Sequence, residues 1–69
     1  MTQTQKILDY IDKFGSISSM EAFLDLGITR LAARIHDIEH QGVSIDRKTE
    51  YTLNRFNEKV HYTRYSRAA

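Results

Sequence analysis

The stretch Gly27-Ile28-Thr29-Arg30-Leu31-Ala32-Ala33-Arg34-Ile35-His36-Asp37-Ile38 joins a glycine turn to the start of a helix with one apolar side. On a helical wheel the apolar side chains of that helix fall within a narrow arc, at the i, i+4, i+7 spacing: Leu31, Ile35 and Ile38. This arc must face a core, because burial of apolar surface is the main favourable term in folding. We therefore predict a helix over residues 29–41 that is capped by Thr29 and packs one side against the rest of the chain.

The outer side of the predicted helix has a short side chain at Ala33 and positive charge near its start, at Arg30 and Arg34. A small side chain lets a helix approach base edges in the major groove of DNA, and an arginine can form two hydrogen bonds with guanine. These features predict a recognition helix that places Thr29, Arg30, Ala33 and Arg34 in the major groove, with Arg30 as the main base-reading residue. A surface helix whose arginines are only solvated has the same pattern and stays open as the alternative.

Two earlier helices are predicted by capping boxes, in which a hydroxyl caps the helix start and a side chain three residues on reaches back. Thr2 with Gln5 marks the first helix, and Ser18 with Glu21 marks the second. A glycine follows each helix and ends it. The side chains expected on the buried faces are Ile7, Leu8, Ile11 and Phe14 in the first helix and Ala22, Phe23 and Leu26 in the second.

The second helix, the Gly27-Ile28 turn and the third helix have the pattern of a helix-turn-helix, with Ile28 placed to fill the space between the two helices. Between the first two helices, Ser16-Ile17 can add a brief strand to the edge of a sheet. Many two-helix units share this pattern without binding DNA, so the residues beyond the third helix must help to decide the function.

After Gly42 the periodicity changes from helical to alternating, which predicts two strands joined in a hairpin. The polar residues 54–59 form the connection, and Asn57 is the residue there best suited to a left-handed turn conformation. We expect a basic wing in which Arg55, Asn57 and Lys59 contact the DNA backbone or the minor groove. An ordinary hairpin kept soluble by lysine and arginine is the alternative.

Three helices followed by a two- or three-stranded antiparallel β-sheet with a hairpin wing make an α+β winged helix-turn-helix, which we expect residues 1–69 to form as a single domain. Tyr62 is expected in the core of the small sheet. Phe56, at the exposed tip, is expected to wedge into DNA or to pack on another copy. The last residues, 65–69, are expected to fray.

The net charge of +1 hides an uneven distribution, since residues 1–29 sum to −2 and residues 30–69 sum to +3. The positive part begins where the predicted recognition helix begins, which suits a phosphate backbone. The chain has no cysteine, so neither a disulfide nor a thiolate zinc site is expected to stabilise it. No basic and apolar leader and no long apolar run stand in the sequence, so we expect a cytoplasmic protein without membrane contact.

No cluster in the sequence supports catalytic or cofactor chemistry. His36 and His40 stand four residues apart on one helix, but Asp37 and Glu39 are the only further ligands nearby, so phosphate neighbours are a better interpretation than a metal site. The serines have no matching histidine and aspartate arrangement, and no glycine-rich phosphate loop is present. We therefore expect no enzyme activity, no cofactor, no metal and no small-molecule ligand.

Three segments carry a family resemblance, the most specific being Leu26-Gly27-Ile28-Thr29-Arg30-Leu31-Ala32-Ala33-Arg34-Ile35. Together with residues 15–23 and the closing segment from Asn54-Arg55-Phe56 to Arg64-Tyr65, it resembles the small winged helix-turn-helix DNA-binding proteins of bacterial phages and prophages. The resemblance covers nearly the whole chain. It implies a regulator of transcription or an architectural factor of the excisionase kind, associated with the nucleoid of the host bacterial cell. The chain departs from many relatives at Asn57, where they have a glycine near the wing tip.

The sequence therefore predicts a phage protein that binds double-stranded DNA, with the helix of residues 29–41 in the major groove and the wing of residues 54–59 on the backbone or minor groove. Because few cations reach the duplex, we expect self-association on DNA, as a dimer or as several copies side by side. The alternative is a protein–protein interaction module on the same scaffold, for example an inhibitor of a host or phage protein, that uses Phe56 and the outer side of the third helix. Single-strand binding through the hairpin aromatics is a third hypothesis.

Overall fold

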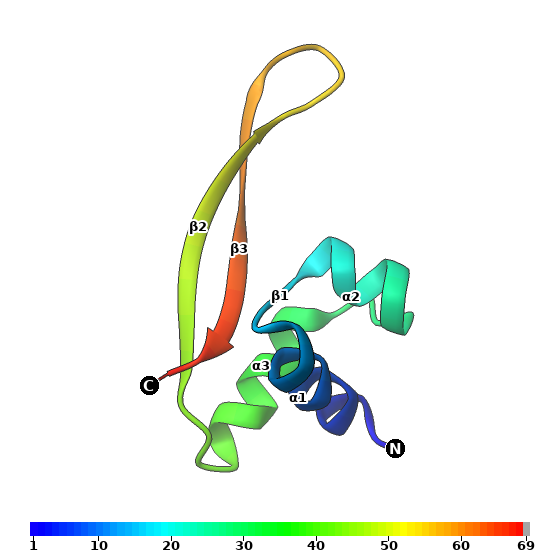
Figure 1. Ribbon diagram of the computed structural model, residues 1–69, viewed down its shortest axis with the longest axis vertical. Helices are drawn as coiled ribbons and strands as arrows, with labels where there is room; N and C mark the ends of the chain where they lie inside the picture. Colours follow the sequence, from blue (N-terminus) through cyan, green and yellow to red (C-terminus); the bar gives the residue numbers. More distant parts are fainter. Residues whose placement is uncertain (69) are drawn as a thin grey trace.

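Three helices gather at one end of the molecule, and a long β-hairpin rises from them (Figure 1). The computed structural model describes residues 1–68. Its elements in chain order are α1 (Gln3–Phe14), β1 (Ile17–Ser18), α2 (Ser19–Leu26), α3 (Leu31–His40), β2 (Ile45–Leu53) and β3 (Lys59–Arg67). This arrangement confirms the predicted α+β winged helix-turn-helix, with a sheet of three strands.

Both predicted capping boxes form. The Thr2 hydroxyl accepts a hydrogen bond from the Gln5 N–H at 3.2 Å, and the Gln5 side chain accepts one from the Thr2 N–H at 3.0 Å. At α2, the Ser18 hydroxyl accepts from the Glu21 N–H at 3.3 Å, and the Glu21 carboxylate accepts from the Ser18 N–H at 2.9 Å. Gly27 ends α2 in the left-handed conformation, with φ of 70°. Local spacing therefore sets the bounds of these two helices.

α3 begins two residues later than predicted, at Leu31, and ends at His40. Arg30 is its N-cap, because the Arg30 carbonyl accepts the first helical hydrogen bond, from the Arg34 N–H at 3.2 Å. The backbone of Arg30 is not helical, with φ of −120° and ψ of 59°, and no side chain caps this end. The prediction that Thr29 caps the helix is therefore wrong, and Thr29 lies in the turn that precedes α3.

The sheet has the order β1-β3-β2, and β3 is antiparallel to both neighbours. Tyr65 of β3 stands opposite Ile17 of β1 on one side and Arg47 of β2 on the other. The brief strand expected near Ile17 is thus confirmed, and its pairing adds a third strand to the hairpin.

The end of β3 is ordered by burial and hydrogen bonding. The expectation that residues 65–69 fray is therefore wrong for residues 65–68. Tyr65 is buried, and the Ala68 N–H donates a hydrogen bond to the Ser44 carbonyl at 3.0 Å. Burial of a large aromatic side chain opposes fraying, because opening the strand would return its apolar surface to water. Residue 69, also in the predicted frayed end, lies outside the described residues.

The core is rich in isoleucine and lies between the helices and the base of the hairpin. Its buried side chains are Ile7, Ile11, Ile17, Ala22, Ile28, Leu31, Ile35, Ile38, Ile45 and Tyr65. This burial confirms the predicted inner side of the third helix and the position of Ile28 in the turn.

Two aromatic residues expected in the core are exposed, Phe14 at 63 % and Phe23 at 54 %. Phe14 stands in the last turn of α1 and packs against Tyr10, with the ring centroids 4.7 Å apart. Phe23 lies beside the line of Ala22 and Leu26, which is the line that α2 turns toward the core. Helical spacing allowed both residues to be buried, but the core ends before it reaches them.

Tyr62 is half-buried, and Tyr65 occupies the core position that was expected for it. Successive side chains of a strand point to opposite faces of a sheet, so two tyrosines three residues apart face opposite ways. The Tyr62 hydroxyl donates a hydrogen bond to the Glu50 carboxylate at 2.9 Å, on the face away from the core.

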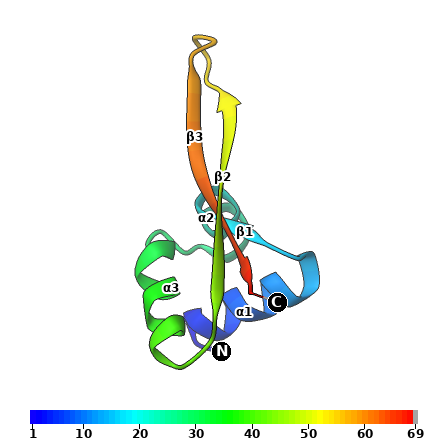
Figure 2. The same ribbon diagram turned by 90° about the vertical axis from the view of Figure 1, so that its left-hand side faces the viewer.

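The hairpin is a projecting arm. β2 and β3 have nine residues each, which corresponds to about 30 Å of strand. Its outer part, residues 51–61, is exposed throughout. Figure 2 shows the arm rising above the helices, with α3 to one side of its base. The fold therefore places α3 at the base of the arm and the turn of residues 54–58 at its far end (Figure 1).

Candidate nucleic-acid interface

The start of α3 presents the first group of predicted DNA contacts. Arg30 is exposed, and its guanidinium forms no ion pair with any residue in the described range 1–68. Thr29 is also exposed, and Ala33 is half-buried on the side of α3 away from the core. One uncompensated cation and two small side chains therefore stand together where the helix begins.

Arg34 is held differently from Arg30. Its Nε lies 3.1 Å from a carboxylate oxygen of Asp37, one turn along α3. The pair is close in distance but poorly aligned as a hydrogen bond, because Nε is buried and has no well-directed acceptor. About a third of the Arg34 side chain, 34 %, is exposed. Its charge is thus partly balanced within the helix, unlike that of Arg30.

The turn at the arm tip is built around one asparagine, Asn54, whose role in the turn the sequence did not indicate. The Asn54 side-chain oxygen accepts hydrogen bonds from the N–H groups of Phe56, at 2.9 Å, and Glu58, at 3.0 Å. The Asn57 N–H donates to the Asn54 carbonyl at 3.1 Å, and Asn57 has φ of 59°. The predicted left-handed conformation of Asn57 is confirmed. Phe56 is 84 % exposed, as expected for the tip.

Both predicted wing cations are exposed, but only one has a neighbour. The Lys59 ammonium lies 4.6 Å from the centroid of the Tyr51 ring, a cation–π contact that leaves its charge uncompensated. Tyr51 stands opposite His61 in the sheet, with the ring centroids 6.3 Å apart. Arg55 is exposed and forms no ion pair within residues 1–68. Tyr51 and His61 were missed by sequence reasoning, because their pairing depends on the strand register.

Arg47 ties the base of the arm to α3. Its guanidinium donates to both oxygens of Glu39, at 3.0 and 2.6 Å. These hydrogen bonds hold the pKa of Glu39 below its ordinary value, although burial acts in the opposite direction. A bidentate arginine–carboxylate pair fixes the relative orientation of the two side chains as well as their distance. It therefore holds β2 against the last turns of α3.

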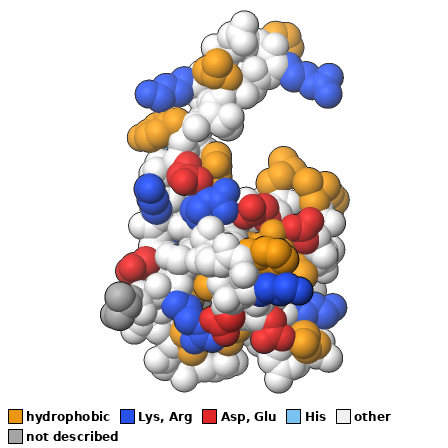
Figure 3. Space-filling model, in the orientation of Figure 1, with side chains coloured by type: hydrophobic (Ala, Val, Ile, Leu, Met, Phe, Trp, Pro, Cys, Tyr) orange, Lys and Arg blue, Asp and Glu red, His pale blue; other side chains and the backbone are white. Residues whose placement is uncertain are grey.

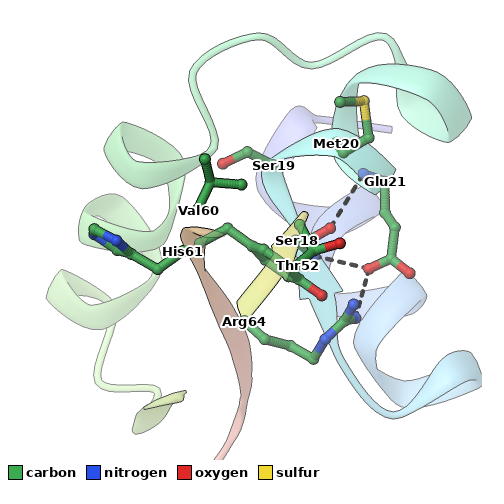
Figure 4. Close-up of a pocket in the computed structure, with 9 residues that line it drawn as sticks. Ser18, Ser19, Met20, Glu21, Thr52, Val60, His61 and Arg64 are labelled. Atoms are coloured by element: carbon green, nitrogen blue, oxygen red, sulfur yellow. Dashed lines mark hydrogen bonds and ion pairs between the residues drawn. The ribbon is translucent and has the colours of Figure 1, made fainter. Parts of the chain in front are cut away.

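Arg64 ties the other strand to the helices. Its guanidinium donates to Glu50 of β2 at 2.7 Å, to Glu21 of α2 at 2.7 Å and to Ser16 at 3.2 Å. Figure 4 shows Arg64 directed from the hairpin toward Glu21 at the start of α2. The hydrogen bonds from Arg64 and then from Tyr62 hold the pKa of Glu50 below its ordinary value. Arg47 and Arg64 thus belong to the positively charged segment of residues 30–69, but their charges pair with carboxylates and hold the hairpin against the helices.

A groove of about 560 Å³ lies between the outer hairpin and the start of α2, and its lining includes Met20, Val60 and Tyr62 (Figure 4). Beyond it, the outer side of α2 exposes three large apolar side chains: Met20 at 66 %, Phe23 at 54 % and Leu24 at 70 %. In Figure 3 hydrophobic side chains gather over α2, while lysine and arginine stand on the arm. The helical end of the molecule thus carries an exposed apolar surface, and further exposed apolar side chains stand on the arm among its cations.

His36 and His40 are in contact on α3, with their Nε2 atoms 2.9 Å apart. Within residues 1–68 no group of three histidine, cysteine, aspartate or glutamate side chains is placed to hold a metal ion. Over the same residues, no helix is long and apolar enough to cross a membrane.

One of the comparisons with known proteins matches almost the entire chain. A family model described as a winged helix-turn-helix domain matches residues 2–68. No curated protein and no solved structure matches the chain significantly.

Proposed function

The chain belongs to the winged helix-turn-helix domain family, and from this membership we propose that it binds double-stranded DNA through α3 and the hairpin arm. Domains of this kind act by binding and typically carry no catalytic machinery, so the function that we propose is not enzymatic. We further propose that residues 1–69 act as one domain.

The pattern of ion pairing is the observation that carries this proposal. Arg47 and Arg64 are held by carboxylates of other elements, whereas Arg30, Arg55 and Lys59 form no ion pair within residues 1–68. A cation that is already paired must lose its partner before it can neutralise a phosphate, and an unpaired one need not. Over the same residues Lys6, Lys13 and Lys48 are unpaired as well, but of the cations proposed to contact DNA only Arg34 is paired, so Arg30, Arg55 and Lys59 remain available to a duplex.

The proposed contacts divide between base reading and backbone binding. Arg30 would form two hydrogen bonds with a guanine in the major groove, with Thr29 and Ala33 allowing close approach and Arg34 on the flank. Arg55, Asn57 and Lys59 would contact the backbone or the minor groove. An arm of about 30 Å is comparable to one turn of DNA, about 34 Å, and we propose that its tip contacts the duplex that binds at α3.

The finer proposal is a phage regulator of transcription or an architectural factor of the excisionase kind, acting on the nucleoid of a bacterial host. It rests on the family resemblance of residues 15–23, 26–35 and 54–65. Because one copy offers few unpaired cations, we propose that occupancy of DNA requires several copies on repeated sites.

A second candidate function is a protein-interaction module. The exposed apolar side chains Met20, Phe23 and Leu24 on α2 favour it, because large apolar patches on small soluble domains often mark contact surfaces. Phe56 at the tip, which is 84 % exposed, is a second anchor for such a partner.

Selection of bound sequences from a pool of random duplexes tests the first proposal. Enrichment of a common site that depends on Arg30 supports it, and the spacing of repeated half-sites would report how copies assemble. Failure to bind duplex at low salt, together with capture of one protein partner that is lost in a Leu24→Ser variant, would favour the second candidate.

A further inference from the structure

Two histidines, His36 and His40, form a polar cluster on the outer side of α3. His36 and His40 lie one turn apart, so their side chains cover neighbouring surface. Both residues are exposed, and their rings meet edge to face with centroids 4.4 Å apart. The rings point their Nε2 atoms at each other, at 2.9 Å, which requires one nitrogen to donate and the other to accept.

This separation is that of a hydrogen bond, and it keeps the two nitrogens close enough to bind one metal ion once the rings turn so that both lone pairs point to the ion. Imidazole nitrogens bind first-row metals at about 2.1 Å, and two such ligands at right angles therefore lie about 3.0 Å apart. Two ligands at a tetrahedral angle lie farther apart, at about 3.4 Å. Adjacent positions of a square-planar or octahedral ion therefore require the smaller change from the observed 2.9 Å, with the rings turned toward the ion.

The surroundings restrict the chemistry to these two nitrogens. Glu39 lines the same shallow hollow as the two histidines, but Arg47 donates to both of its oxygens. Asp37 is paired with Arg34. A donor set of neutral imidazoles without carboxylates disfavours Mg²⁺ and Ca²⁺, which prefer oxygen, and suits Cu²⁺ and Ni²⁺.

The sequence favoured no metal at this pair, but the close approach of the two rings changes that interpretation. We propose that His36 and His40 form a two-coordinate chelating site for a divalent transition-metal ion of the Cu²⁺ or Ni²⁺ type, with its remaining positions open to outside ligands. Binding replaces the contact between the two rings, and the ring that donates moves its proton from Nε2 to Nδ1. No proton is lost overall and no electron is transferred. Within residues 1–68 no third histidine, cysteine, aspartate or glutamate side chain is placed to complete the coordination.

The place of the pair on α3 links the ion to DNA. His36 and His40 follow Ala33 along the outer side of the helix, away from the buried line. A dication there adds positive charge, and open coordination positions, to the surface that would face the duplex. This part of the inference rests on the proposed function: we expect the bound ion to strengthen DNA binding.

The chelate is tested by titrating the full chain with NiCl2 or CuCl2 in a calorimeter. We expect one ion per chain and affinity for either ion at least about tenfold weaker in His36→Ala and in His40→Ala, because the remaining ligand binds alone. His61→Ala is the matched control, since His61 is exposed and lies on the hairpin outside the pair. Zn²⁺, which prefers the tetrahedral angle, should bind more weakly than Cu²⁺.

Thermal unfolding provides a second measurement. At a metal concentration about 100 times the parent's Kd, the Tm should rise by about 10 °C or more in the parent and in His61→Ala, and by about half as much or less in His36→Ala. Equal affinity in the parent and both pair variants, or no binding at all, would overturn the site.

The effect on DNA is measured separately, so that its failure can be told apart from failure of the proposed function. Ni²⁺ should lower the Kd for duplex in the parent and in His61→Ala, and leave it unchanged in His36→Ala. Metal binding without this change would overturn the regulatory part alone. Absence of duplex binding with or without metal would instead refute the proposed function, while the calorimetric result decides the site.

Discussion

The salt dependence of duplex binding depends on the ion pairs of the structure. Of the proposed contacts, only Arg30, Arg55 and Lys59 carry charge that no carboxylate within residues 1–68 compensates. Each phosphate neutralised contributes about −0.9 to the slope of log K against log salt concentration, so we expect a slope of about −2.7. The affinity should then fall about 40-fold between 50 and 200 mM salt.

The sequence alone leads to a different value. Eight lysines and arginines stand between Arg30 and the chain end, and if all of them met phosphates the slope would be about −7. The structure lowers this expectation because Arg34, Arg47, Arg64 and Arg67 are each paired with a carboxylate. Lys48 is unpaired within residues 1–68 but is not among the proposed contacts, which leaves three cations.

Fluorescence anisotropy of a labelled duplex, titrated at several salt concentrations, measures this slope. We expect Arg30→Ala and Lys59→Ala each to reduce its magnitude by about 0.9. Arg30→Ala should also remove sequence preference, whereas Lys59→Ala should weaken all duplexes alike. Lys6→Ala is the matched control, because it removes the same charge from α1, outside the proposed surface.

Three results would refute the reasoning. A slope near −7 would mean that the ion pairs open when DNA binds. Equal effects of Lys6→Ala and Lys59→Ala would mean that the protein attracts DNA without a defined surface. Unchanged binding in both Arg30→Ala and Lys59→Ala would remove α3 and the arm from the interface.

Three further predictions concern the fold that holds this surface. Arg64→Met should lower the free energy of unfolding by about 1–2 kcal/mol, because it leaves Glu21 and Glu50 half-buried without a cation. Urea denaturation measures the loss. An equal loss in Arg67→Met, whose pair with Asp12 is more exposed, would contradict this prediction. The pKa of Glu50 is lowered from its ordinary value of 4.5 in the folded state, so the stability from this carboxylate is present above about pH 4.5 and is lost as the pH falls through the lowered value. Urea midpoints should therefore decline below pH 4.5 more steeply in the parent than in Glu50→Gln, and identical profiles would show that the carboxylate is not linked to folding. Asn57→Val should destabilise the fold by about 1–2 kcal/mol and Asn57→Gly should not, because φ is 59° at this position; similar thermal unfolding of both variants would argue against a left-handed tip.

Local patterns predicted most of the fold. The capping boxes at Thr2 and Ser18 depend on residues three positions apart, so the sequence contains everything that decides them. The same is true of the left-handed position at Asn57, which a short polar side chain tolerates. The buried line of α3 was also predictable, since one helical repeat determines which side chains share a side.

The errors arose where the extent of the core mattered. Phe14 and Phe23 have spacing compatible with burial, but only ten side chains of the described residues form the buried core, and it ends short of both. Tyr62 and Tyr65 are indistinguishable by composition, and their opposite faces result from the register that pairs Tyr65 with Ile17. The start of α3 was misplaced because Thr29 is a favourable capping residue that the backbone does not use.

Some features of the candidate site could have been found from spacing. Arg34 and Asp37 are three residues apart on one helix, which predicts their contact. The cation–π contact of Lys59 with Tyr51 could not be predicted from the sequence, because these residues approach each other only when the two strands adopt their register. The turn bonds of Asn54 depend on backbone conformation that the polar run of residues 54–59 did not specify.

The sequence by itself determined where the first two helices begin, where the chain reverses and which residues carry charge, because these properties depend on neighbours within one or two turns. Apart from the local pair of Arg34 with Asp37, tertiary structure decided which charges remain available to a ligand. The pairs of Arg47 with Glu39, Arg64 with Glu21 and Arg67 with Asp12 join different elements, and the last two span 43 and 55 positions of the chain. Coulomb attraction between such residues is effective only at short range, so packing of the helices against the hairpin had to bring them together first.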